Sequence, residues 1–265
     1  MKHSRVPEAR KRARAWPFRL ARSLLYTAYL AFHLVPHAGT AAEVRVEHNI
    51  AKHILEQNSD FEAATHLVDI PGLSSPRVCR FLNELVRQMD PGEAYLEVGT
   101  FKGRTLLSAA WNNRGKRCVG CDKFRLWGRF TGPGFLARRA LLANVSKHRA
   151  YTADIEFYPI TSRELLDRKL VTGPVGVYFY DGDHSYEGTH HGVCGAVRLL
   201  ARRSVLVMDD YNDPIIRCAT REAIAAAGLQ VLWHRNLRGD HTETGFWNGL
   251  GVFFLEKPST LFKTV

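Results

Sequence analysis

Short apolar runs alternate with longer amphipathic runs along the chain from about residue 93 onward. The apolar runs predict strands, and the runs with apolar residues three and four positions apart predict helices between them. Five strands separated by helices indicate a mostly parallel α/β sheet with helices on both faces. The last two strands have no helix between them, which predicts an antiparallel hairpin. The predicted strands cover residues 94–98, 116–122, 155–159, 175–181, 204–210, 229–234 and 249–255.

Two further helices are predicted before the first strand. Residues 43–57 place apolar side chains at mixed spacings of three and four. In the helix predicted from about residue 75, Ser75 is the expected N-cap and Pro76 the first-turn residue. The pattern thus divides the chain into an N-terminal arm (1–42), a helical lead-in (43–92) and an α/β domain (93–258).

The N-terminal arm carries most of the net charge. Residues 1–22 contain eight lysines and arginines and one acid, which is +7 of a formal net charge of +11. Such a block is typical of a solvated arm, with a membrane surface or a polyanion as the alternative contact. An apolar stretch at 24–35 follows. We interpret this stretch as a helix for a membrane surface or a partner, with packing on the main domain or a cleaved signal as alternatives, so membrane contact is expected through residues 1–36.

The number of cysteines and the length of the apolar runs indicate the cellular compartment in which the protein is expected. The chain has five cysteines, an odd number without a dense framework, which fits a reducing compartment. Cys118 and Cys121 form a single C-x-x-C on a predicted strand, whose alternation sends the two thiols to opposite faces, so zinc is not expected. No apolar run is long enough for a membrane-spanning helix. We therefore expect a cytoplasmic protein, with peripheral membrane contact through the arm as an alternative.

Glycines and an acid follow the first two predicted strands, at the edge of the sheet where ligands of such folds bind. Gly99 and Gly103 allow a ligand to approach the backbone closely. Their loop has neither the G-K-[ST] ending of a phosphate-binding loop nor the G-x-G-x-x-G pattern of a dinucleotide site. Asp122 ends the second strand, 19 residues after Gly103, where a carboxylate can accept both hydroxyls of a ribose.

These motifs resemble those of a known family. The segments EVGTFKGRT and CVGCD are similar to motif I and the ribose-binding acid of class I S-adenosylmethionine-dependent methyltransferases, which have a Rossmann-like sheet ending in an antiparallel hairpin. The segments VYFYDGDHSYEG and VLVMDDYND resemble small-molecule O-methyltransferases of the DGDHSYE type. That group is related to the macrolide and aminocoumarin sugar O-methyltransferases and to catechol O-methyltransferase. The resemblance covers residues 75–257.

The resemblance implies S-adenosyl-L-methionine as the cofactor. It also implies which residues bind it. Thr161 and Ser162 stand where the family often has an acid after the third strand, and Ser162 is expected to bond the adenine edge instead. The implied cofactor-binding residues are Glu97, Gly99, Thr100, Gly103, Asp122, Ser162 and Asp181.

Three aspartates follow the fourth and fifth strands, which are neighbours in this fold. Asp181, Asp209 and Asp210 should therefore converge, and three carboxylates at close range need a compensating cation. Oxygen ligands favour Mg²⁺, with Ca²⁺ and Mn²⁺ as alternatives, and the related methyltransferases hold Mg²⁺ with acids at these positions. The competing interpretation is that such residues only cap the helix that begins at Pro214, as Asp213 is expected to do.

His184 is the candidate general base. The corresponding place in catechol O-methyltransferase holds the lysine that deprotonates the substrate, and an imidazole with a reference pKa of about 6.5 suits that task near neutrality. Asp183 is the competing base. The alternative role for His184 is that of a loop residue bonded to Tyr186 or to the metal ligands.

Two aromatic segments are expected near the pocket. Residues 123–139 interrupt the strand–helix rhythm and are interpreted as a loop or lid. Within it, Trp127 is assigned to the adenine, to the substrate or to the core, and these remain alternatives. Trp247 belongs to the terminal hairpin and is expected to border the acceptor site.

These features predict metal-assisted O-methylation of a small hydroxylated acceptor, a sugar or a glycosylated metabolite. The alternative is a module that binds the cofactor without turnover and docks through its basic arm. A nucleic-acid partner is not expected, because acidic strand ends would repel phosphates. A dehydrogenase is disfavoured because the dinucleotide loop is missing. A homo-oligomer is compatible with the sequence.

Overall fold

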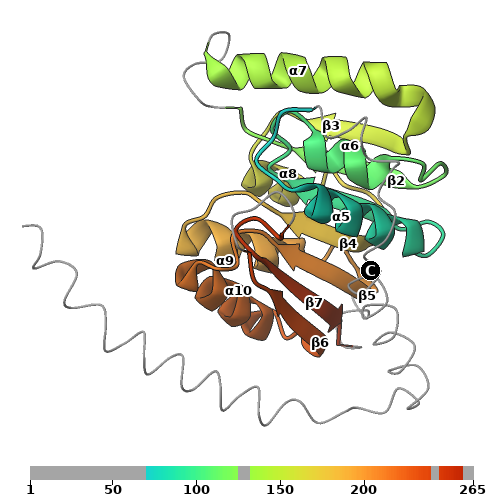
Figure 1. Ribbon diagram of the computed structural model, residues 1–265. Coiled ribbons are helices and arrows are strands. Elements are labelled where there is room, and N and C mark those ends of the chain that lie inside the picture. Colours follow the sequence, from blue (N-terminus) through green and yellow to red (C-terminus); the bar gives the residue numbers. More distant parts are fainter. Residues whose placement is uncertain (1–69, 125–131, 240–244, 259–265) are drawn as a thin grey trace, which may run out of the picture. The chain divides into compact units, whose positions relative to one another are not determined.

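Seven strands form one mixed sheet in the order β3-β2-β1-β4-β5-β7-β6 (Figure 1). The computed structural model describes residues 70–124, 132–239 and 245–258. Strands β3, β2, β1, β4 and β5 run parallel, whereas β7 is antiparallel to both of its neighbours. The strands are Ala94–Val98 (β1), Arg117–Cys121 (β2), Asp154–Tyr158 (β3), Val175–Tyr180 (β4), Leu200–Met208 (β5), Gln230–Leu237 (β6) and Leu250–Glu256 (β7). This Rossmann-like arrangement confirms the predicted fold class.

Helices cover both faces of the sheet. One buried cluster joins the sheet to α5, α6 and α7, and a second joins it to α8, α9 and α10 (Figure 1). Successive side chains of a strand point to opposite faces of the sheet and therefore enter different clusters. Cys118 packs in the first cluster and Cys121 in the second, as predicted. The helices are Pro76–Gln88 (α5), Arg104–Ala110 (α6), Pro133–His148 (α7), Ser162–Asp167 (α8), Tyr186–Ala196 (α9) and Pro214–Ala226 (α10), and a short 3-10 turn covers Arg149–Tyr151.

Side-chain caps fix where several helices begin. Ser75 accepts a hydrogen bond from the Val78 backbone N–H at 3.2 Å, with Pro76 in the first turn of α5. Asp213 accepts from the Ile215 N–H at 2.6 Å and caps α10. Both caps confirm the prediction. The cap role of Asp213 also separates it from the neighbouring acids Asp209 and Asp210.

Two predicted elements differ from the structure. The loop expected over residues 123–139 is wrong from residue 133, where α7 begins with a proline that suits a first helical turn. The glycines clustered in this segment indicated a loop, but Gly134 is a buried residue of α7. The strand predicted to begin at residue 204 begins at Leu200, where it already pairs with Val175, and the helix predicted before it ends at Ala196.

Other predictions fall outside the described residues. These include the arm 1–42, the helix over 43–57 and Trp127. Within the residues that the structure describes, no helix combines the length and the apolar character needed to cross a bilayer.

Candidate active site

The glycine loop between β1 and α6 touches the loop after β4 through its backbone. Gly99 has a φ of +94°, and a side-chain carbon added there would lie 1.8 Å from the carbonyl oxygen of Asp181. Gly103 has a φ of +89°, and a carbon added there would lie 2.5 Å from Leu141. Only glycine fits these two positions. The predicted cofactor loop and the predicted acidic cluster are therefore in direct contact.

Asp122 lies beside this loop, as predicted from its place at the end of β2. Its carboxylate accepts a hydrogen bond from the Phe101 N–H at 2.9 Å and another from the Phe124 N–H at 2.8 Å. An ionised carboxylate has about four acceptor positions, so each oxygen keeps capacity for another donor. The residue holds the glycine loop in place and can still accept from a ribose.

Glu97 has protein partners for both carboxyl oxygens. It is fully buried and accepts from the Tyr95 hydroxyl at 2.6 Å and from the Thr105 hydroxyl at 2.9 Å. Burial raises the pKa of Glu97 to about 8. These contacts tie β1 to α6 and support the cofactor loop from beneath, whereas a direct cofactor contact stays a prediction.

Thr100 and Ser162 also lie at this edge of the sheet. The Thr100 hydroxyl oxygen is buried without a hydrogen-bond partner among the described residues, and the Thr100 methyl packs over Gly120. An orphaned hydroxyl beside a ligand loop is free to bond a ligand. Ser162 is the first residue of α8, and its side chain hydrogen-bonds to Tyr180. Its contact with adenine stays a prediction.

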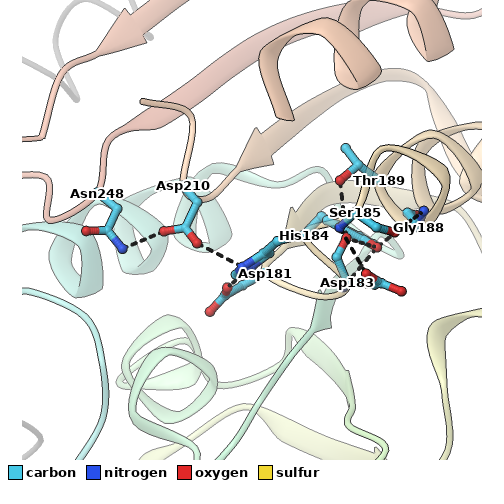
Figure 2. Close-up of polar contacts among 9 residues, drawn as sticks. Asp181, Asp183, His184, Ser185, Gly188, Thr189, Asp210 and Asn248 are labelled. Carbon is cyan, nitrogen blue, oxygen red and sulfur yellow. Dashed lines mark hydrogen bonds and ion pairs between the residues drawn. The ribbon is translucent and has the colours of Figure 1, made fainter. Parts of the chain in front are cut away.

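Acidic side chains meet around His184 at the ends of β4 and β5 (Figure 2). His184 Nε2 lies 3.1 Å from Asp181 Oδ1, and its Nδ1 lies 2.9 Å from Asp210 Oδ2. These three side chains bring potential metal-ligating atoms within 4.8 Å of one another. The predicted convergence of Asp181 and Asp210 is thus present, with a histidine between them.

Asp209 is the most deeply buried acid of the group. Only 6% of the residue is exposed, and its Oδ1 has no hydrogen-bond partner among the described residues. Burial, followed by the charges of Asp181 and Asp210, raises the pKa of Asp209 well above its ordinary value. Burial also raises the pKa of Asp181 to about 6. A buried carboxylate oxygen without a donor is the kind of group that a cation satisfies.

The two predicted bases differ in environment. Hydrogen bonds to Asp181 and Asp210 raise the pKa of His184 to about 10, so in this arrangement the imidazole holds protons on both nitrogens at neutral pH. This differs from the expectation drawn from its reference pKa. Asp183 accepts from the Ser185 N–H at 3.0 Å, and bonds from Ser185 lower its pKa. Asp183 therefore belongs to the start of α9, apart from the acidic cluster (Figure 2).

Residues 96–211 match the model of a family described as a methyltransferase domain. This match agrees with the order of the strands in the sheet. Residues 96–211 therefore belong to a methyltransferase domain, in a sheet of the form predicted for class I S-adenosylmethionine-dependent methyltransferases. A search of curated protein sequences finds no significant match.

Solved structures share the fold of this methyltransferase domain. One is an O-methyltransferase from Bacillus cereus in complex with SAH, at 16% identity and a TM-score of 0.51, covering 86% of this chain and 96% of that one. Another is the O-methyltransferase TomG from Streptomyces achromogenes, involved in tomaymycin synthesis and solved with SAM. It has 16% identity and a TM-score of 0.51, covering 79% of this chain and 96% of that one.

Tyr180 is a residue of the methyltransferase site that sequence reasoning missed. Its hydroxyl accepts from the Asp183 N–H at 3.2 Å and donates to the Gly188 carbonyl at 2.9 Å. A carbon added at Gly192 would lie 2.2 Å from the Tyr180 ring, so α9 also packs closely against the ring. Tyr180 therefore supports the loop that carries Asp181 and His184. A tyrosine in an apolar strand is usually a core residue, so the sequence held no signal for this role.

Asn248 is the second missed residue. It lies in the turn between β6 and β7, and its side-chain amide donates to Asp210 Oδ1 at 2.6 Å (Figure 2). Its neighbour Trp247 is half-buried and has a φ of +51°, an uncommon conformation for a bulky residue. The glycine- and asparagine-rich segment GFWNGLG was the available signal, but it indicated a turn and drew attention only to Trp247.

Proposed function

We propose that this domain transfers the methyl group of S-adenosylmethionine to a hydroxyl oxygen of a small acceptor, with a divalent metal ion, Mg²⁺, at the acidic cluster. The observation that carries the proposal is the buried, unpartnered Oδ1 of Asp209 beside two further carboxylates. Backbone contact between Gly99 and Asp181 keeps this cluster next to the cofactor loop. A methyl donor and an acceptor oxygen can thus be held side by side.

The donor set fits a hard divalent cation. Asp181 and Asp210 offer carboxylate oxygens, the ligands that Mg²⁺ prefers, in one group of atoms with His184. Asp209, predicted as the third ligand, is not part of that group, although the charges of Asp181 and Asp210 are near enough to raise its pKa and its Oδ1 has no partner among the described residues. A cation bound there would supply positive charge that lowers the pKa of an acceptor hydroxyl. The cluster also contains His184, a nitrogen donor, so Mn²⁺ is an alternative ion.

Cofactor binding is assigned to the residues around the glycine loop. Asp122 accepts from the ribose hydroxyls, Thr100 offers its unpartnered hydroxyl, and Gly99 and Gly103 leave room beside the backbone. Glu97 acts from beneath by holding α6 against β1. S-adenosylmethionine supplies the transferable methyl group on its sulfonium centre.

Proton removal is assigned to His184. In the structure its nitrogens contact Asp181 and Asp210, and these contacts keep both nitrogens protonated at neutral pH. We propose that a cation held by these carboxylates would end that stabilisation of the imidazolium, so that one ring proton is released to solvent and the freed nitrogen can accept the proton of the acceptor hydroxyl. Asp183 is the weaker candidate, because its lowered pKa reduces its basicity and its Oδ1 is bonded within the loop.

The acceptor is proposed to be a sugar or a glycosylated metabolite in the cytoplasm. TomG, which shares the fold, is involved in the synthesis of a small molecule, which supports an acceptor of that class. Acidic strand ends argue against nucleic acid, since they would repel its phosphates. Membrane contact through residues 1–36 and assembly into a homo-oligomer remain proposals.

Calorimetry with S-adenosylmethionine, with and without MgCl₂, tests this function on the full chain. We expect the wild type and Asp209→Ala to bind the cofactor, and only the wild type to bind Mg²⁺. Asp213→Ala is the matched control, because it removes a carboxylate that caps α10 on the same loop. Failure of the wild type to bind the cofactor would overturn the enzyme proposal. Turnover of an acceptor panel that is unaffected by EDTA would overturn the metal assignment.

A further inference from the structure

The turn over residues 245–249 is fastened to α5 at its first half. Ser75 Oγ donates to the carbonyl of Gly245 at 2.5 Å. The guanidinium of Arg77 lies 4.5 Å from the centre of the Phe246 ring, and Phe81 meets the same ring edge-on with 6.4 Å between centres. Phe246 itself is buried. This half of the turn is thus held to α5 by a buried aromatic contact and by a hydrogen bond.

The second half of the same turn is fastened to the loop after β5. The carbonyl of Asn248 accepts from the Asn212 N–H at 3.1 Å, and the carbonyl of Gly249 accepts from the Tyr211 N–H at 2.9 Å. Asn212 also donates from its side chain to the Gly239 carbonyl at 3.1 Å. The backbone of the turn is therefore fixed beside Asp210 without help from the Asn248 side chain.

The Asn248 side chain then reaches Asp210 itself. Its amide nitrogen donates to Asp210 Oδ1 at 2.6 Å, while Oδ2 of the same carboxylate faces His184 at 2.9 Å. One oxygen is thus held by the turn, and the other points into the cluster (Figure 2). Asp210 also has a φ of +51°, in the left-handed region that aspartate adopts more readily than most residues.

We infer that Asn248 is a positioning residue: its amide orients the Asp210 carboxylate toward the acidic cluster and links that cluster to the α5-anchored turn. The inference rests on the proposed function, because it takes Asp210 to be one of the cation ligands. Residues that orient a ligand in this way typically contribute 10–100-fold to metal affinity. Asn248 is expected to act through Asp210 rather than on the acceptor or the cofactor.

Three variants separate this role from simple packing. Asn248→Ala removes the donor, and Asn248→Leu keeps a side chain of similar size without the donor. Asn236→Ala is the matched control, since Asn236 lies on β6, which leads toward the same turn, and its Oδ1 has no partner among the described residues. The backbone hydrogen bonds of the turn remain in all three proteins, so we expect each to fold.

Calorimetric titration with MgCl₂ and MnCl₂ in the presence of S-adenosylmethionine is the first measurement. We expect about 10–100-fold weaker cation binding for Asn248→Ala and Asn248→Leu, and wild-type affinity for Asn236→Ala. Cofactor affinity should stay unchanged in all of them. Wild-type cation affinity in Asn248→Leu would overturn the inference, because packing alone would then account for the residue.

Crystal structures of the metal-free wild type and Asn248→Ala give a reading that does not depend on a cation. The Asp210 carboxylate should leave its position beside His184 in the variant, and an unmoved carboxylate would overturn the inference. A wild type that binds the cofactor but no cation would instead overturn the metal assignment in the proposed function. The two failures are therefore distinguishable.

Discussion

The acids beside the cofactor loop and the acids at the ends of β4 and β5 lie next to one another but are satisfied differently. Glu97 and Asp122 each have two protein donors, one for each carboxyl oxygen. Asp209 has an oxygen without any partner among the described residues. Asp181 and Asp210 share a single imidazole between them, and Asp210 also accepts from the Asn248 amide.

This difference distinguishes acids that hold the protein structure in place from acids that are expected to bind a cation. Each carboxyl oxygen of the first pair already has a protein donor, so these acids hold the loop in shape, and Asp122 keeps capacity for a further donor. The second group gathers negative charge around one imidazole, and the buried oxygen of Asp209 has no donor among the described residues, which is unfavourable unless a cation is supplied. The buried acid without a donor thus indicates where a cation is expected.

The largest expected effect comes from Asp209→Asn. Methyl transfer should fall by more than about 100-fold, because the variant removes a proposed cation ligand rather than misplacing it. The unfolding free energy of the metal-free protein should rise by about 1–3 kcal/mol, because the penalty of burying this acid beside two others is removed. Activity assays and urea denaturation with EDTA check both. A variant that loses activity and stability together would contradict the comparison.

Asp122→Ala tests the other side of the comparison. We expect cofactor affinity to fall by roughly 100-fold, since charge-assisted hydrogen bonds to the ribose are lost and the Phe101 N–H loses its acceptor. Mg²⁺ binding should change little. Calorimetry with S-adenosylmethionine measures the first effect, and Asp154→Ala, which removes an exposed acid on the neighbouring strand, is the control. Unchanged cofactor affinity would remove Asp122 from the site.

Glu97→Gln tests whether burial sets the pH dependence of stability. The folded pKa of Glu97 is about 8, above an unfolded value of about 4.3. The contribution of Glu97 to the free energy of unfolding is therefore greatest below about pH 4.3. It is lost as pH rises to about 8, by at most ~1.4 kcal/mol per pH unit.

Denaturation between pH 5 and 8 should show a shallower decline for Glu97→Gln than for the wild type. Glu156→Gln is the control, because a hydrogen bond from Arg117 lowers the pKa of Glu156. Its contribution is lost only as pH falls toward acid, outside this range. Parallel curves for the wild type and Glu97→Gln would show that Glu97 is ionised throughout.

The smallest expected effect belongs to Tyr180→Phe. Losing the hydroxyl should cost about 1 kcal/mol of stability, and the loop that carries His184 should lose its support. Tyr178→Phe is a matched control, because Tyr178 donates to the Gly192 carbonyl at 3.1 Å within α9. Thermal melts should shift similarly for both, whereas kcat should fall about tenfold only for Tyr180→Phe. Equal kcat values would reduce Tyr180 to a packing residue.

The sheet and most of its edge follow from the sequence because their signals are local. Apolar runs mark the strands, and in a parallel sheet the residues after β1, β2, β4 and β5 must meet at one edge. Asp181 and Asp210 were therefore predictable as neighbours. The capping residues Ser75 and Asp213 were predictable for the same local reason.

The remaining features depend on contacts between distant parts of the chain. Asn248 and Asp210 are 38 positions apart, and their hydrogen bond requires the turn to lie on the β5 loop. The high pKa of His184 requires carboxylates from two different strands. The helical start of α7 at Pro133 depends on the burial of Gly134, which its local composition does not indicate.

The position of β7 in the sheet determines how much of the chain must be synthesised before the sheet can be completed. Strand β6 has β7 as its neighbour in the sheet, and β7 comes later in the chain and inserts between β5 and β6. A nascent chain that ends before Leu250 therefore leaves β6 unpaired and Asn248 unanchored. The sheet beside the acidic cluster is therefore complete only when residues up to Glu256 are available to pair with β5 and β6.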